Sequence, residues 1–522
     1  MRGPRSFPFR AGAKPAQQQN EAIARAFTAP SPYGGWNARG NLANMPVTDA
    51  IQMDNIFPGV QDVSLREGYV NWSTGYAENI RTLIAYTGKS SSKLFAATNV
   101  GIYDATSSGT VGAAATACTN GLYHYVNFVN SGNSYIILAN GSDAVKSYDG
   151  AAWAAPAITG VTPANLFYVH SHKKRLWFVE NASMNLWYLG TDAIAGAATQ
   201  FPVGALFKKG GYVVAIGSWT IDSGSGADDL FVIATSNGEI AVYQGTDPAS
   251  STTWALIGVY EVPRPLGSHP FLDYGGDLLY LSKNGIIPMS KLAQSVVIDR
   301  SGLISFKIDG AYLDAAATYA GNQGWQAIPH RSKNMLLINV PVSQDTLSVQ
   351  FVMNSITQAW CRFTNWNAST WATLGDDLYF AGGRVVAKAF QGFNDNGTPI
   401  TGVVAQAYSP LGYRGQKNIS LARPNFGQSA ALTFVAALDN DFKTFQGQTT
   451  INYASTATGA IWDTSLWNTG IWDSGATVIE PRWQTIPNNL GYLHSFRLQI
   501  TSSTSSFFWT STDYAYRPAG IL

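Results

Sequence analysis

The sequence predicts an all-β protein, a six- or seven-bladed β-propeller with an extended N-terminal arm and a C-terminal β domain. Three observations predict this class: a two-strand pattern returns seven times, aromatic residues make up 13% of the chain, and helical periodicity is nearly absent. Aromatic side chains suit pleated sheets that are stacked face to face. With 522 residues, of which 46% are hydrophobic, the chain can bury a large core.

The clearest copy of the pattern is 93–106, KLFAATNVGIYDAT, which reads as strand, turn and strand with apolar residues at alternate positions. Similar hairpins follow along the chain, and the seven starts are Leu94, Tyr135, Leu176, Leu230, Leu278, Met335 and Leu378. Successive starts are 41, 41, 54, 48, 57 and 43 residues apart. This is near the period of about 40–50 residues that a four-stranded propeller blade occupies.

The repeat divides the chain into three regions. Residues 1–55 are predicted to form an N-terminal arm and loop, 56–395 the propeller, and 396–522 a C-terminal β domain like a sandwich or jelly roll. The second boundary rests on the tight-turn signal of Asn396-Gly397, after which alternating strands continue. A strand within 70–76 is a candidate for closing the ring against the last blade.

Composition argues against several classes of protein. The sequence has no run of about eighteen apolar residues and no apolar stretch behind its basic N-terminus, so we expect neither a membrane anchor nor a secretory signal. Cys118 and Cys361 are too few for a disulfide framework and are expected to be free thiols. A formal net charge of +1 argues against a broad basic surface that grips nucleic acid, but not against a wall past which DNA slides.

Two kinds of basic segment have a structural and a functional interpretation. The N-terminal segment carries Arg2, Arg5, Arg10 and Lys14, and it is a solvated tail, an arm that docks on an acidic neighbouring subunit, or a segment that contacts DNA directly. Two short loops between predicted strands are also basic. Their residues, Lys173, Lys174, Arg175, Lys208 and Lys209, either face a channel or a phosphate backbone, or are solvated turn residues.

Three tryptophans, Trp462, Trp467 and Trp472, recur five residues apart in GAIWDTSLWNTGIWDSG. This spacing alternates between the two sides of an extended chain, so the rings cannot all line one flat face. They either pack on a neighbouring sheet or form a loop that stacks on sugars or grips a subunit.

Catalytic and metal-binding patterns are not evident. The sequence lacks a G-x-S-x-G nucleophile elbow and a phosphate-binding loop, and its six histidines are scattered. His170 and His172 share a face if the chain is extended, yet no third ligand is near them in the sequence. We therefore expect no catalytic residue, no metal and no cofactor.

The region from 57 to 104 resembles the opening of the tail nozzle, or packaged-DNA-stabilisation, proteins of short-tailed bacteriophages. The shared features are an F-P pair, an R-x-G-Y motif, a T-G pair and an L-F-A-A-T…G-I-Y-D hairpin. The residues are Phe57, Pro58, Arg66, Gly68, Tyr69, Thr74, Gly75, Leu94, Phe95, Ala96, Thr98, Gly101, Tyr103 and Asp104. Glu67 departs from the pattern, since proline is expected there in that family.

The resemblance implies a structural virion protein at the distal end of a short tail, made in the host cytoplasm. It implies a ring of six copies that encloses a channel, retains packaged DNA and passes it to the host. The implied partners are further copies of the chain, a tail adaptor protein, tail fibre or spike proteins, and double-stranded DNA in the lumen. Two alternatives are a glycan-binding or glycan-cleaving propeller (a lectin or depolymerase) and a propeller scaffold outside any virus.

Overall fold

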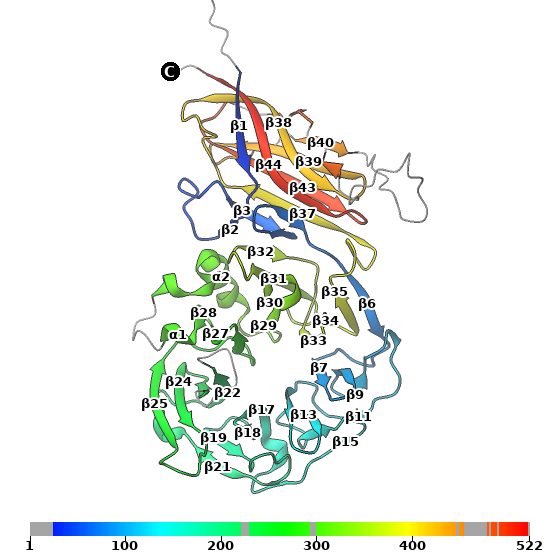
Figure 1. Cartoon of the computed structure of the whole chain (residues 1–522), viewed down its shortest axis with the longest axis vertical. Coiled ribbons are helices and arrows are strands. Elements are labelled where there is room, and N and C mark those ends of the chain that lie inside the picture. The colour runs from blue at the N-terminus through cyan, green and yellow to red at the C-terminus, as the bar shows by residue number, and fades with distance from the viewer. Residues whose placement is uncertain are drawn as a thin grey trace, which may run out of the picture.

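The computed structural model describes residues 24–220, 229–292, 299–444, 448–453, 478–479, 482–487 and 490–519. Strands dominate these residues, and they form a ring of small sheets with a second β unit beside it (Figure 1). The predicted all-β class is confirmed.

Seven groups of antiparallel strands make up the ring in the described residues, and we number them as blades 1 to 7 in chain order. The strands of blades 6 and 7 are joined through β3, β37 and β36 in one larger sheet. The first strands of successive blades contact one another, which places these strands around the axis (Figure 1). From the axis outward, blade 1 contains β7 (Thr82–Thr87), β8 (Ser92–Ala97), β9 (Gly101–Asp104) and β11 (Thr116–Ala117). Blade 2 contains β12 (His124–Val129), β13 (Ser134–Ala139), β14 (Lys146–Tyr148) and β15 (Trp153–Ala154). Blade 3 contains β17 (Leu166–His172), β18 (Arg175–Glu180), β19 (Asn185–Tyr188) and β21 (Thr199–Pro202).

Three of the other four blades also have four strands, and blade 5 has three. Blades 4 and 5 are β22 (Val213–Trp219), β23 (Leu230–Thr235), β24 (Glu239–Gly245) and β25 (Trp254–Glu261); and β26 (Phe271–Tyr274), β27 (Asp277–Ser282) and β28 (Gly285–Pro288). Blades 6 and 7 are β29 (Gln326–His330), β30 (Met335–Ser343), β31 (Leu347–Asn354) and β32 (Trp360–Phe363); and β33 (Thr370–Leu374), β34 (Asp377–Gly382), β35 (Val385–Ala389) and β6 (Tyr69–Thr74).

Each of the seven predicted hairpins contributes the second strand of a blade, and those strands are β8, β13, β18, β23, β27, β30 and β34. Second strands are buried because neighbouring strands and neighbouring blades cover them on all sides. In β23 every residue of LFVIAT is buried. This is why the second strands read as continuous apolar runs and were visible in the sequence.

The ring is closed by β6, which pairs antiparallel with β35 from Ala389↔Tyr69 to Val386↔Ser73. A strand from before the first blade therefore completes the last one, as the sequence suggested for 70–76. Closure of this kind removes a free sheet edge and joins both ends of the repeat array.

Blade 5 has three strands, and a helical segment follows it in the chain. This segment contains α1 (Met289–Leu292) and α2 (Asp309–Tyr319), which pack against strands of blades 5 and 6. The insertion accounts for the longest interval between hairpin starts, 57 residues from Leu278 to Met335. No helix among the described residues is long and apolar enough to cross a membrane.

The second β unit has two sheets that face each other. One contains β1 (Arg25–Pro30), β4 (Ile56–Pro58), β5 (Val63–Leu65), β38 (Lys417–Gln428), β41 (Val478–Ile479), β42 (Gln484–Thr485) and β44 (Phe507–Pro518). The other contains β2 (Gly35–Trp36), β3 (Asp49–Asp54), β37 (Thr398–Gln406), β39 (Leu432–Asn440), β40 (Thr449–Tyr453) and β43 (His494–Ser502). Ring pairs Phe426–Phe434 (4.6 Å) and Phe496–Trp509 (5.5 Å) join the two sheets.

The N-terminal part of the chain differs from the arm and loop expected over 1–55. Within the described residues, β1 pairs with β44 along its whole length and β3 pairs with β37. Segments 25–30 and 49–54 are therefore strands of the second β unit, which is built from both ends of the chain. Sequence reasoning missed them because their partners lie hundreds of residues away and RAFTAP lacks an alternating pattern.

The remaining described elements are short. They are β10 (Gly109–Thr110), β16 (Ile158–Thr159), β20 (Gly196–Ala197), β36 (Asn394–Asp395) and the 3₁₀ turns η1 (Pro163–Asn165), η2 (Gly204–Leu206), η3 (Arg300–Gly302), η4 (Ile304–Ile308) and η5 (Arg331–Lys333). Cys118 and Cys361 are free and buried, as expected.

Candidate functional site

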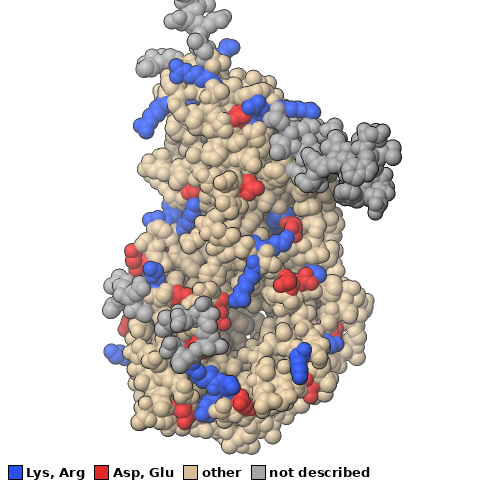
Figure 2. Space-filling view, in the orientation of Figure 1, with Lys and Arg blue, Asp and Glu red and all other residues tan. Residues whose placement is uncertain are grey.

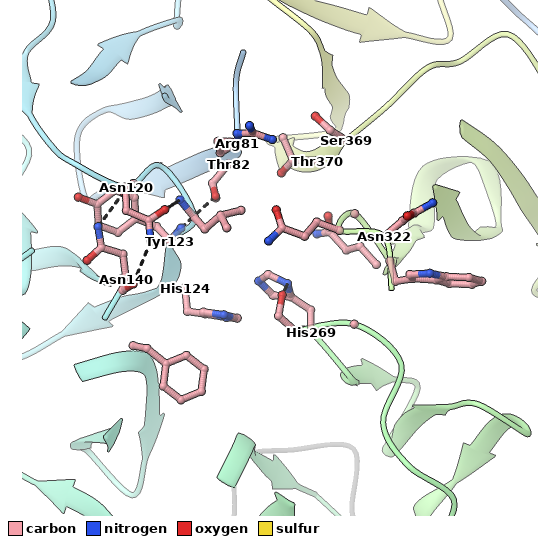
Figure 3. Close-up of a pocket in the computed structure, with 18 of the residues that line it drawn as sticks. Arg81, Thr82, Asn120, Tyr123, His124, Asn140, His269, Asn322, Ser369 and Thr370 are labelled. Atoms are coloured by element: carbon pink, nitrogen blue, oxygen red, sulfur yellow. Dashed lines mark hydrogen bonds between the residues drawn. The ribbon is translucent and has the colours of Figure 1, made fainter. Parts of the chain in front are cut away.

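A pocket lies at the centre of the ring, at the end where the first strand of each blade begins (Figure 3). Its volume is about 540 Å³. It is lined by the starts of β7, β12, β17 and β33, and by the loops that precede β26 and β29. Six of the seven blades supply its lining residues, so the pocket is assembled from residues far apart in the sequence.

His124, at the start of β12, and His269, just before β26, both line the pocket and face each other across the ring (Figure 3). Their ring centroids are 4.3 Å apart with an interplanar angle of 32°. Tyr168 packs on His124 with ring centroids 4.4 Å apart. The two histidines belong to blades 2 and 5, which are not neighbours, so their contact crosses the ring.

Both imidazoles are neutral at pH 7. Burial lowers the pKa of His269 to about 4, and burial together with the nearby His269 holds the pKa of His124 well below its usual range. A neutral imidazole presents one N–H donor and one acceptor nitrogen. Nδ1 of His269 lies 3.1 Å from Oγ of Ser268, whereas Nδ1 of His124 has no hydrogen-bond partner among the described residues.

An ion pair also crosses the rim of the pocket. Nη1 of Arg81, just before β7, lies 2.6 Å from Oδ2 of Asp345, in the turn between β30 and β31. These residues belong to blades 1 and 6, with blade 7 between them. Arg81 and Asp345 are the only cation and the only carboxylate among the pocket-lining residues that the structure describes, so the lining carries no net charge.

Amide side chains, together with Ser, Thr and Tyr hydroxyls, supply the remaining polar lining. Some are held in place: Asn140 donates from Nδ2 to the Asn120 carbonyl (2.7 Å), and Asn322 donates to the Pro341 carbonyl (2.9 Å). Two others, Asn181 and Gln323, are exposed, and no side-chain hydrogen bond joins them to another described residue. The half-buried ring of Phe167 adds an apolar surface beside them. The pocket therefore offers a hydrogen-bonding surface with no net charge and with aromatic side chains among its lining.

The predicted basic loops do not contribute to this pocket. Lys173 and Lys174 form the two-residue turn after β17, with φ of 47° and 56°, a left-handed geometry typical of tight hairpins. Lys208 and Lys209 precede β22, and their backbone N–H groups donate to the Glu239 carboxylate at 3.0 and 2.9 Å.

These two loops lie at opposite ends of adjacent strands. Nδ1 of His172, at the end of β17, is 2.8 Å from Oγ of Ser218, near the end of β22, so the late residues of both strands lie together. Lys208 and Lys209 are at the other end of β22. Three of the basic side chains form ion pairs, namely Lys173–Asp229 (3.3 Å), Arg175–Asp247 (3.2 Å) and Lys209–Glu261 (2.9 Å). The structure does not bring the two loops into one basic site.

His170 and His172 share the Ser218 hydroxyl, at 3.0 and 2.8 Å. No group of three or more potential metal ligands occurs in the part of the chain that the structure describes. The other predicted site residues, Arg2, Arg5, Arg10 and Lys14 in the N-terminal segment and Trp462, Trp467 and Trp472, lie outside the described residues.

Sequence reasoning missed the pocket because its residues share no motif. A signal was nevertheless present: polar residues stand just before or at the start of the first strand in several blades, as in RT at 81–82, YH at 123–124, SH at 268–269 and ST at 369–370. Aligning the blades by their second strands would have placed these residues at one end of the ring.

Comparisons with known proteins add little to this picture. No family model and no curated protein matches the sequence. Among solved structures, the extracellular domain of the putative hybrid two-component system BT4673 from B. thetaiotaomicron has a TM-score of 0.40 and 11% identity, over 77% of this chain and 58% of that one. Chaetomium thermophilum Raptor has a TM-score of 0.36 and 10% identity, over 62% of this chain but only 29% of its own. A glycoside hydrolase family 43 arabinoxylan arabinofuranohydrolase from Bacillus subtilis has a TM-score of 0.26 and 10% identity, over 86% of this chain and 97% of that one. No function is drawn from these likenesses.

Proposed function

We propose that this chain is a structural virion protein that forms the distal nozzle of a short phage tail. The observation that carries the proposal is the resemblance of 57–104 to nozzle proteins, together with the place of its motif residues in the fold. Arg66, Gly68 and Tyr69 of the R-x-G-Y motif lie between the second β unit and the propeller, where they contact both. A buried ion pair at this connection suits a wall that must withstand the pressure of packaged DNA.

In this proposal the DNA channel lies between copies of the chain and not along the propeller axis. The His124–His269 contact, with ring centroids 4.3 Å apart, crosses that axis. A DNA duplex has a major groove that alone is about 12 Å wide, so it cannot pass such a constriction. Each propeller would then be one segment of the ring wall, and a ring of six copies would enclose the lumen.

The charge distribution also supports a wall past which DNA slides. On the face shown in Figure 2, lysines and arginines are scattered, with several at the upper end and aspartates and glutamates among the others, and they form no continuous basic patch. Strong phosphate neutralisation would slow DNA movement, because each contact must be broken as the duplex advances. The proposed partners remain the tail adaptor, the fibre or spike proteins and the transported DNA.

The test is immunogold electron microscopy of intact and DNA-emptied phage particles with an antibody against this chain. We expect label at the distal end of a short tail in both states. Label on peripheral fibres alone, or on no particle, would overturn the proposal. Negative-stain images of the purified chain mixed with its tail adaptor should also show closed rings.

Glycan binding is a second candidate function, which the pocket favours over glycan cleavage. Glycosidases of the usual kind need two carboxyl groups about 5–9.5 Å apart. Asp345 is the only carboxylate among the described pocket residues, and it is ion-paired with Arg81 at 2.6 Å. The amide, imidazole and aromatic lining can bind a sugar without any acid or base.

A further inference from the structure

We propose that the central pocket binds an uncharged saccharide, with a terminal or branch sugar entering it end-on. The inference rests on the second candidate function and names its site and its ligand class. It does not depend on whether the chain forms a nozzle.

The charges of the lining decide between ligand classes. The Arg81 guanidinium is neutralised by Asp345 at 2.6 Å, and both imidazoles are neutral at pH 7 because burial lowers their pKa values. A phosphate or carboxylate ligand would lose its hydration water on binding, and no unpaired cation in the lining would compensate for that cost. Anionic ligands are therefore disfavoured, and so are cations, because the one carboxylate is already paired.

The polar groups that are left match hydroxyl groups. A sugar hydroxyl donates one hydrogen bond and accepts others, and each amide or neutral imidazole likewise offers donor and acceptor capacity. Asn181 and Gln323 make no side-chain hydrogen bond to another described residue, and Nε2 of His269 makes none either. Together they can satisfy several hydroxyl groups without a charge on either side.

Size and shape fit the same class of ligand. The volume of about 540 Å³ lies within the range of about 300–1,000 Å³ that is usual for small-ligand sites. Phe167 supplies an apolar face against which the C–H side of a sugar ring can pack. A peptide that binds by strand addition needs an exposed sheet edge, whereas this pocket is lined by strand starts and loops.

The His124–His269 contact explains the end-on geometry. β17 contributes Phe167 to the lining, but Tyr168 and His170, which lie further along the strand, do not line it. The pocket therefore ends near the level of the histidines, where a polysaccharide cannot thread through the ring. Only a chain end or a short branch can enter.

The experiment compares the full chain with three single substitutions. Asn181→Ala and Gln323→Ala remove exposed side chains of the pocket without breaking a described side-chain hydrogen bond, so both variants should fold. Gln200→Ala, in the outer strand β21 of blade 3, is the matched control for an exposed amide outside the pocket. Each protein is applied to immobilised glycans that end in glucose, galactose, mannose, N-acetylglucosamine or glucuronic acid, and to a peptide array. Calorimetry with the best free sugar then gives the affinities.

We expect a neutral glycan to bind the unmodified chain and the Gln200→Ala variant equally, and to bind each pocket variant at least tenfold more weakly. If a glycan binds but both pocket variants keep full affinity, the site assigned here is wrong while the glycan-binding function stands. If only glucuronic acid or peptides bind, the ligand class is wrong. If no glycan binds, both this inference and the second candidate function are overturned.

Discussion

The guanidinium of Arg66 forms a bidentate ion pair with Asp395, at 2.8 Å from Nη1 and 2.6 Å from Nη2, and its side chain is completely buried. Nε donates to Oδ1 of Asn55 (2.8 Å) and Nη2 also donates to the Thr364 carbonyl (2.8 Å). The indole of Trp366 lies 4.9 Å from the guanidinium carbon. Arg66 therefore ties the second β unit, the end of blade 6 and the segment after blade 7 into one joint.

Replacing Arg66 with methionine should destabilise the protein by about 3–5 kcal/mol, because it leaves the Asp395 carboxylate buried without its counter-charge. Urea unfolding followed by tryptophan fluorescence measures the loss. Lys93→Ala is the control, since the Lys93–Asp104 pair is exposed (33% and 42%) and should contribute less than about 1 kcal/mol. Equal losses in the two variants would show that the joint does not stabilise the fold.

Gly68 should tolerate no side chain. A Cβ at this position would lie 1.7 Å from the carbonyl oxygen of Asn394, and the Gly68 N–H donates to the Gly392 carbonyl at 2.8 Å. Gly68→Ala must therefore push apart two backbone segments of the joint, and we expect a loss of at least about 3 kcal/mol or insoluble protein. In Gly112→Ala the added Cβ meets nothing within 4 Å, so this variant should keep the melting temperature of the unmodified protein. A stable, soluble Gly68→Ala protein would contradict this account.

Stability should fall as the pH is lowered from 6.5 to 4, because several histidines are buried in their neutral form. Burial, followed by the charges of His170 and Lys173, lowers the pKa of His172 to about 3, while Asp229 opposes the shift. The unfolded chain binds a proton near pH 6.5 and the folded chain does not, so each step below that pH favours unfolding. One such histidine contributes up to about 3 kcal/mol of this loss by pH 4.

The measurement is the melting temperature at intervals between pH 7.5 and 4. His172→Asn should show a smaller drop over this window than the unmodified protein, because the unfolded variant has one proton fewer to gain. His330→Asn is a second variant for comparison. Burial also lowers the pKa of His330, but this residue stacks on Phe390, in a different part of the protein from His172. If His172→Asn and the unmodified chain lose the same number of degrees, His172 does not cause the acid sensitivity.

The sequence predicted those parts of the fold that depend on the local pattern of apolar residues. Strands such as β23, which is buried at every residue, must be apolar throughout, and their spacing revealed the blades. The joint could not be predicted, because Arg66 and Asp395 are 329 residues apart in the sequence and the sequence around an arginine does not reveal its ion-pair partner. The pairing of β1 with β44 cannot be predicted for the same reason, and neither can the pocket, because its lining comes from six of the seven blades and shares no motif.

Asp345→Asn tests whether charge neutrality sets the selectivity of the pocket. The Arg81–Asp345 pair is only partly exposed, at 23% and 15%. Replacing the carboxylate by an amide therefore leaves a cation at the rim with no counter-charge among the described pocket residues. The variant should gain affinity for glycans that end in glucuronic acid by about tenfold, since a charge-assisted hydrogen bond contributes about 1.5–3 kcal/mol and part of this is offset by desolvation. The gain should shrink in high salt, because the pair lies near solvent.

Arg81→Gln is the matched reverse change, and it should bind no anionic glycan. A variant that still prefers neutral sugars would show that the amides and imidazoles, and not the ion pair, set the preference.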